Sequence, residues 1–388
     1  MKGNKIANQE DNKKLSVPKE NKKGKYLNEK RKRTEIVEKN KSKETLKETH
    51  EETLSKKMKD SIFPNPCTYV KESTSKIIPI MSHVKIDDKA LKKFVKNLLQ
   101  DKNALKYPKW SETHLDATSV PFESLLRYLF VIDTLNYCFW PNEGYEYYTL
   151  AQNLYKTLKN KKKFFEIDNL IKMTPEQLKE NIFKCDFCLL NERARMIREV
   201  FTIIKNKYNG QCYNFVKACN KDATKLVKQV VDDFWCFRDQ AIYNGEQIFF
   251  YKRAQILVSD IYLAYLDIKD AKKTDKENDV INFTKETISQ LTMFADYRVP
   301  QILRAKGILK YDSHLTDLVD NKKELAHGGK EEIEIRAATI QTVEQIKKML
   351  KEHGREAMSI EVDVYLWEEG EKIKDKVAPH HRTLSIFY

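Results

Sequence analysis

The sequence is poor in the residues that mark fibrous and low-complexity proteins. It contains only 10 Gly and 10 Pro among 388 residues, which excludes collagen-like and Pro/Gly-rich architectures. No run of about 18 apolar residues occurs, so we expect no membrane-spanning helix and no membrane partner. The seven Cys residues are an odd number, and the first residues lack an apolar signal core. The sequence therefore predicts a protein of a reducing, cytoplasmic compartment rather than a disulfide-stabilised secreted one.

Common signatures of metal and phosphate sites are also missing. The sequence has no Gly-rich phosphate loop and no HExxH pair. Cys185 and Cys188 form a single CxxC without a second pair, whereas a structural zinc site needs a fuller ligand set; we expect two buried thiols. His380 and His381 are adjacent, but no neighbouring residues complete a metal site. The sequence thus predicts neither a metal nor an organic cofactor.

Positive charge is concentrated at the beginning of the chain. The formal net charge is +14, and residues 1–60 contribute more than half of it, with 19 Lys and Arg against 11 Asp and Glu. This segment cannot bury enough apolar surface to offset the entropy of ordering, so we expect a disordered, Lys-rich tail over residues 1–60. Its basic runs at 22–25 and 30–33 leave three interpretations open: a solvated tail without a partner, a nuclear import signal, or a contact to RNA.

From residue 61 onward the composition is that of a folded protein. Apolar residues at 90–99 recur at i, i+3, i+4 and i+7, the spacing of one helix face. The block 121–140 is too rich in Leu, Phe and Tyr for a surface helix, and the lead-in punctuated by Pro64, Pro66 and Pro79 is predicted to be extended. Further helices are predicted at residues 149–158, 174–182, 191–208, 213–231, 251–268, 283–294, 300–309 and 340–353.

Strand patterns are few. The segment 247–250 follows the turn signal Asn244-Gly245, and the segment 332–335 alternates in polarity. Residues 269–279 are rich in Lys and Asp and are predicted to form a surface loop. The sequence therefore predicts one mainly α domain over residues 61–388 with at most a small sheet, which we expect to be a monomer.

Some polar residues stand in blocks that are otherwise apolar. Pro300 disfavours helical geometry in the residue before it, so Asp296 and Arg298 are expected at a corner between helices, where side chains can face a cavity. An equally favoured alternative is that Asp296 caps the following helix or pairs with Arg298. Lys252 and Arg253 begin a predicted helix, a position that suits an anion, although a charged first turn on the surface gives the same pattern.

Two further blocks carry groups suited to holding a planar base. Asp363 and Trp367 are four residues apart and share one face if the segment is helical. A carboxylate beside an indole can hold a donor-rich ring; alternatively, Trp367 packs in the core and Asp363 lies on the surface. His114 is predicted in a loop before the apolar block, either as a ligand or as a structural residue.

Six runs of the sequence occur in the same order in one known family. They are residues 133–140, 250–258 (FYKRAQILV), 292–301 (TMFADYRVPQ), 334–336, 363–367 and 381–388. With these runs the chain resembles the queuosine 5′-phosphate N-glycosylase/hydrolase family, the queuosine salvage proteins, from about residue 85 to the end. Two differences are visible. The loop between Trp140 and Tyr147 is shorter than in the family, and Glu368 stands where the family has Asp.

The resemblance implies a mostly helical fold similar to helix-hairpin-helix DNA glycosylases. It also implies hydrolysis of the N-glycosidic bond of queuosine 5′-monophosphate, which yields queuine for reinsertion into tRNA together with ribose 5-phosphate. Matched residue by residue, the family's catalytic carboxylate is Asp296. The residues at positions where the family binds the base are His114, Phe294, Asp363 and Trp367. No cofactor is implied.

Charge alone adds Lys252 and Arg298 as candidate contacts for the 5′-phosphate. It also supports a different hypothesis, a basic helical protein that binds nucleic acid through residues 1–60. That hypothesis predicts salt-sensitive affinity that disappears with the tail, although residues 61–388 carry a net charge of only +6. A DNA glycosylase is suggested by analogy of fold alone. The favoured partner is therefore a small-molecule nucleotide.

Overall fold

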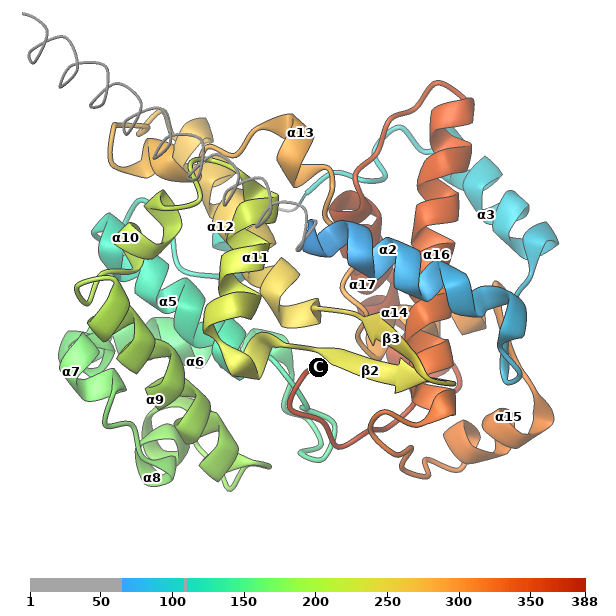
Figure 1. Ribbon diagram of the computed structural model, residues 1–388, viewed down its shortest axis with the longest axis horizontal. Coiled ribbons are helices and arrows are strands. Elements are labelled where there is room, and N and C mark those ends of the chain that lie inside the picture. The colour runs from blue at the N-terminus through green and yellow to red at the C-terminus, as the bar shows by residue number, and fades with distance from the viewer. Residues whose placement is uncertain (1–64, 108–109) are drawn as a thin grey trace, which may run out of the picture. The chain divides into compact units, whose positions relative to one another are not determined.

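The computed structural model describes residues 65–107 and 110–388 (Figure 1). The predicted tail over residues 1–60 lies outside the described residues. The described part is mainly helical and contains two small antiparallel sheets, so the predicted mainly α class with a small β element is confirmed. One sheet pairs β1 (Val84–Ile86) with β4 (Leu309–Tyr311), and the other pairs β2 (Gln240–Tyr243) with β3 (Glu246–Phe249). None of the helices in these ranges has the length and apolarity needed to cross a membrane.

One group of helices surrounds α5 (Phe122–Leu135). This helix buries 11 of its 14 residues, as its apolar composition predicts. Four helices that follow it in the sequence pack around it: α6 (Tyr147–Asn160), α9 (Leu190–Lys207), α10 (Cys212–Lys217) and α12 (Lys252–Asp270). The long α12 therefore leads from the β2–β3 hairpin into the centre of this group.

A second group surrounds α16 (Lys330–Glu352) (Figure 1). Its other members are α2 (Pro66–Ile77), α3 (Asp88–Gln100), α14 (Arg298–Ala305) and α17 (Ser359–Ile373). Gly370 permits a close approach of α17 to α14, because a Cβ at this position would lie 3.3 Å from Cγ of Arg298. The remaining short helices are α4 (Trp110–Thr113), α7 (Ile167–Leu170), α8 (Pro175–Leu178), α11 (Ala223–Asp233), α13 (Lys285–Ile288) and α15 (Ser313–Asp320).

Several predicted boundaries are confirmed and others are wrong. The strand β3, α3, α6, α9 and α12 lie where the sequence places them, within a few residues, and β2 was not predicted. The predicted helix 213–231 is two helices, because Asn220 and Lys221 adopt positive φ angles and Asp222 caps α11. The lead-in predicted to be extended contains α2, in which Pro66 occupies the first turn and Asn65 caps it.

Three further predictions are wrong, and the first of them bears on the site. The predicted helix 283–294 shrinks to α13, and residues 291–297 run without regular structure into α14. The predicted strand 332–335 is wrong, because these residues belong to α16. The predicted helix 300–309 ends at Ala305, and β4 follows it. The irregular segment 291–297 lies beside α17 and the beginning of α12, where it places Phe294 and Asp296.

Candidate active site

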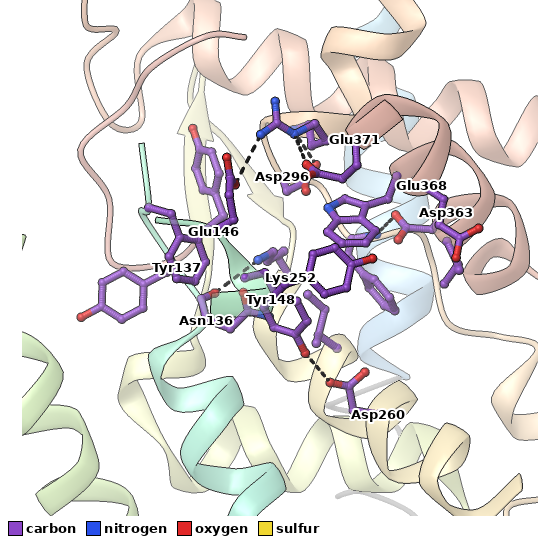
Figure 2. A pocket seen from close by; sticks show the side chains of 18 of the residues that line it. Asn136, Tyr137, Glu146, Tyr148, Lys252, Asp260, Asp296, Asp363, Glu368 and Glu371 are labelled. Atoms are coloured by element: carbon purple, nitrogen blue, oxygen red, sulfur yellow. Dashed lines mark hydrogen bonds and ion pairs between the residues drawn. The ribbon is translucent and has the colours of Figure 1, made fainter. Parts of the chain in front are cut away.

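The residues singled out in the sequence lie around one pocket. It contains about 1100 Å³ of space between atoms, part of it open to solvent. All seven candidate side chains line it: His114, Lys252, Phe294, Asp296, Arg298, Asp363 and Trp367. They come from α12, α17, the segment 291–297, the start of α14 and the residue that follows α4. Figure 2 labels Lys252, Asp296 and Asp363 among them.

Asp296 both caps a helix and faces the pocket, which the sequence had left as alternatives. Its Oδ1 accepts hydrogen bonds from the backbone N–H groups of Arg298 and Val299, each at 3.0 Å, so it caps the first turn of α14. It also lines the pocket, and within the described residues its second carboxylate oxygen makes no hydrogen bond. Burial raises the pKa of Asp296, while the charge of Lys252 opposes that rise. One oxygen is therefore anchored and the other is available to a ligand.

Lys252 brings a positive charge to the same side of the pocket. Its side chain is buried, and Nζ donates a hydrogen bond of 3.3 Å to the carbonyl oxygen of Asn136 (Figure 2). Burial lowers the pKa of Lys252 to about 8, and the charge of Asp296 works against that decrease. Arg253, by contrast, is buried away from the pocket and donates to the carbonyl oxygens of Asp133 and Thr134. The alternative of a charged surface turn at Lys252 and Arg253 is therefore wrong.

Arg298 forms ion pairs with two neighbouring carboxylates. Its Nε lies 2.6 Å from Glu371 and one terminal nitrogen lies 3.6 Å from Glu146. Lys374 bridges the same two carboxylates, at 2.8 Å from Glu146 and 2.9 Å from Glu371. The two positive and two negative charges neutralise each other, and Arg298, Glu146 and Glu371 of this group form one rim of the pocket.

Asp363 and Trp367 lie on one face of α17, as their spacing predicts. Asp363 is buried, and its Oδ1 accepts a hydrogen bond of 3.0 Å from the N–H of Phe294, so its placement on the surface is wrong. Burial raises the pKa of Asp363 well above its ordinary range, and the nearby charge of Asp296 adds to the rise. Trp367 lies 5.2 Å from Tyr148, measured between ring centroids. A carboxyl whose proton is held more tightly than usual thus faces the pocket beside an aromatic wall.

His114 belongs to a hydrogen-bonded group that also lines the pocket. Its ring stacks on Trp110 at 3.5 Å, and its Nδ1 and Nε2 each lie 3.3 Å from a phenol oxygen, of Tyr128 and Tyr147 respectively. The Tyr147 hydroxyl donates to Oδ2 of Asp260, also at 3.3 Å. Burial lowers the pKa of His114 to about 3, so its imidazole is neutral at physiological pH.

The sequence reasoning missed several residues of the pocket. Asp260 lies two helical turns after Lys252 on α12 and faces the same pocket (Figure 2), a spacing that the sequence does contain. Glu146 and Glu371 approach each other only through the tertiary fold, and no local pattern marks them. Tyr388 also lines the pocket.

The pair predicted as ordinary buried thiols is different in the structure. Cys185 is exposed and Cys188 is half-buried, so that prediction is wrong. Sγ of Cys188 lies 3.0 Å from the carbonyl oxygen of Cys138. His381 is buried and His380 is half-buried. Among residues 65–107 and 110–388, no group of three or more His, Cys, Asp or Glu is placed to hold a metal ion.

Asp260 makes a testable contribution to stability. Burial raises its pKa from 3.8 to about 7, so above pH 3.8 the folded state binds more protons than the unfolded state. The free energy of unfolding should therefore decrease as pH rises through this window, by up to about 1.4 kcal/mol per pH unit from this group. Urea unfolding of Asp260→Asn at pH 5 and pH 7 should show a shallower decrease than the wild type.

Asp270 provides the matched control. It is exposed at the end of the same helix, and Asp270→Asn should keep the wild-type dependence on pH. An Asp260→Asn protein that retains the full wild-type decrease would contradict the assignment of this proton to Asp260.

A pocket that joins buried carboxyls, a lysine and an aromatic wall is typical of an enzyme acting on a planar, nitrogen-rich small molecule. Residues 113–388 match the model of the family described as queuosine salvage protein. The chain belongs to this family.

Similar proteins are known from distant organisms, and each is named queuosine 5′-phosphate N-glycosylase/hydrolase. One from Dictyostelium discoideum is 39% identical over 334 residues, which cover 84% of this chain and 100% of the relative. One from Sphaerobacter thermophilus is 36% identical over 69% of this chain and 82% of the relative. One from Mus musculus is 30% identical over 79% and 94%, respectively.

Proposed function

We propose that this protein hydrolyses the N-glycosidic bond of queuosine 5′-monophosphate and releases queuine and ribose 5-phosphate, so that queuine can return to tRNA. The observation that carries the proposal is the position of Asp296, which presents a free carboxylate oxygen to a pocket that Asp363 and Trp367 also line. Its support from the comparisons is the common name of the similar proteins.

Asp296 is proposed as the catalytic carboxylate. Cleavage of a glycosidic C–N bond passes through an oxocarbenium-like state, in which positive charge develops on the ribose. A carboxylate below C1′ stabilises that charge and orients the attacking water, which adds to C1′ and gives a proton to the carboxylate as the base departs with the bond electrons. The two N–H groups that hold Oδ1 of Asp296 fix the direction of the other oxygen.

The base is proposed to bind between Phe294, Asp363, Trp367 and His114. Queuine is a 7-deazapurine and lacks the N7 that purine hydrolases protonate, so the ring must be activated through hydrogen bonds at other atoms. The raised pKa of Asp363 favours its protonated form, and a protonated carboxyl can donate to the departing base. Trp367 supplies a flat apolar surface on the same face of α17.

Lys252 and Arg298 are proposed as polar contacts of the ribose-phosphate part. Lys252 lies close enough to Asp296 to influence its pKa, and Arg298 follows Asp296 by two residues along the pocket wall. Because the pocket is complete within one chain, the protein is proposed to act as a monomer, and its seven free Cys side chains suit a cytoplasmic location.

The direct test is to incubate the full chain with queuosine 5′-monophosphate and to detect free queuine by chromatography. We expect release of queuine from this nucleotide and none from guanosine 5′-monophosphate, which lacks the 7-substituent. The same preparation should leave duplex DNA intact. Absence of queuine release at high enzyme concentration, with the protein folded by circular dichroism, would overturn the proposal.

A further inference from the structure

A second hollow adjoins the pocket just described. It contains about 1060 Å³ of space between atoms, part of it open to solvent. The two hollows share four lining residues, Phe139, Glu146, Tyr297 and Arg298. Tyr297 directly follows Asp296 in the chain, so the second hollow begins next to the proposed catalytic carboxylate.

The two hollows differ in charge. The first is lined by six carboxyl side chains and two cationic ones. The second is lined by four cations, Arg298, Lys322, Lys374 and Arg382, and by three carboxylates, Glu143, Glu146 and Asp375. A phosphate dianion is repelled by an excess of carboxylates and attracted to an excess of cations. The second hollow is therefore the more favourable of the two for an anion.

Arg382 is a cation without a carboxylate partner among the described residues. Its guanidinium lies 5.3 Å from the centroid of the Trp140 ring, and Trp140 is fixed by a hydrogen bond of 3.1 Å from Nε1 to the carbonyl oxygen of Thr383. Nε of Arg382 is buried and has no hydrogen-bond partner in the part of the chain that the structure describes. A guanidinium held over an aromatic ring and free of carboxylate partners is pre-oriented for a phosphate.

Lys322 supplies a second cation of this kind. It is exposed after the end of α15, lines the second hollow, and pairs with no carboxylate of the described residues. His380 also lines the second hollow, and its ring centroid lies 4.5 Å from that of Tyr297. Burial lowers the pKa of His380 to about 4, and the cations Arg298, Arg382 and Lys322 lower it as well. Arg298, Lys322 and Arg382, from three separate segments of the chain, thus place positive charge around the second hollow.

We propose that this second hollow binds the 5′-phosphate of the nucleotide, with Arg382 and Lys322 as its contacts. The proposal rests on the proposed function, which places C1′ of the ribose at Asp296. The base would occupy the first pocket. The ribose would lie beside Tyr297, which lines both hollows, so that its 5′ end reaches the second hollow. Arg298 then borders the phosphate while remaining paired with Glu371, and Lys252 stays beside the sugar.

The test compares a nucleotide with its nucleoside. For Arg382→Gln and Lys322→Gln, we expect kcat/KM on queuosine 5′-monophosphate to decrease roughly 10- to 100-fold, because each change removes a charged contact. Activity on queuosine, which has no phosphate, should stay at the wild-type level. The matched control is Lys323→Gln. Lys323 is the next residue along the chain, pairs with Asp317 at 2.8 Å and lies outside the hollow, so both substrates should react as before.

A binding measurement separates this proposal from the proposed function. Ribose 5-phosphate should quench the tryptophan fluorescence of the wild type at lower concentration than ribose does, and Arg382→Gln and Lys322→Gln should remove that preference. A wild type that hydrolyses the nucleotide while both variants match it on nucleotide and nucleoside would overturn the phosphate site alone. An equal loss on both substrates in both variants would also overturn it. A wild type without hydrolysis, but with phosphate-dependent binding of the sugar, would instead contradict the proposed function.

Discussion

Asp296→Asn should reduce kcat on queuosine 5′-monophosphate by at least about 10²–10³-fold, the cost of removing one electrostatic contact to a transition state. Asn has nearly the same shape as Asp, and its amide oxygen can still accept the N–H groups of Arg298 and Val299. The cap of α14 is therefore retained, and only the negative charge below the ribose is lost. Steady-state kinetics should show the decrease in kcat with KM within a few-fold of the wild type.

A second substitution at position 296 distinguishes the effect of losing the charge from the effect of losing the helix cap. Asp296→Ala removes the charge and the cap together, so it should also lower the free energy of unfolding by about 1 kcal/mol. The control for capping alone is Asp312→Ala. Asp312 caps α15 through a hydrogen bond of 2.7 Å from the N–H of Leu315 and lies outside the pocket, so wild-type kcat is expected. An Asp296→Asn protein that keeps most of its turnover would disprove the catalytic role.

The parts of this site that follow local rules could be predicted from the sequence. Asp363 and Trp367 share a face because their spacing fits one helical turn, and α17 has the expected helical geometry. Pro300 marks the beginning of a helix, and this placed Asp296 at a corner before it. In both cases the information lies within about five residues of the side chain concerned.

The errors arise where distant partners decide the structure. Residues 332–335 alternate between charged and apolar side chains and resemble a strand, yet they belong to α16. Glu334 is buried in this helix because it accepts hydrogen bonds from the backbone N–H groups of Ser82, His83 and Val84. These partners lie about 250 residues earlier in the chain, so no local pattern could show that a glutamate at this position faces the interior.

The same limitation applies to Glu146 and Glu371, which face each other across the rim of the pocket. Glu146 precedes α6 and Glu371 lies near the end of α17, and each alone has the appearance of a surface residue. Their partners Arg298 and Lys374 bring them together in the folded chain. The resemblance to a known family could indicate which residues matter, but not which charges neutralise one another.

Arg336 should be the most sensitive position for stability outside the pocket. Its guanidinium is buried, makes a bidentate ion pair with Asp239 at 3.0 and 2.5 Å, and lies 3.3 Å from Glu332. Arg336→Met would leave both carboxylates buried without this partner. Breaking a buried ion pair in this way typically costs about 3–5 kcal/mol, and urea unfolding should show a decrease of that size.

A surface arginine with the same kinds of contacts serves as the control. Arg195 pairs with Glu192 and Glu199, each at 2.9 Å, and lies over the exposed ring of Trp235. Solvent screens these pairs, so Arg195→Met should cost about 1 kcal/mol or less. Equal losses in the two variants would show that the burial of Arg336 has no special effect on stability.

Arg336 also connects stability to the proposed chemistry. Its Nε donates a hydrogen bond of 3.0 Å to the carbonyl oxygen of Ala295, the residue before Asp296, and its guanidinium is held between the rings of Phe250 and Tyr388. Arg336→Met should therefore loosen the segment that carries Asp296, even under conditions where the variant is fully folded. We expect kcat to decrease at 10 °C without urea, whereas Arg195→Met should keep the wild-type value. A folded Arg336→Met protein with unchanged kcat would show that Asp296 is positioned by its own cap alone.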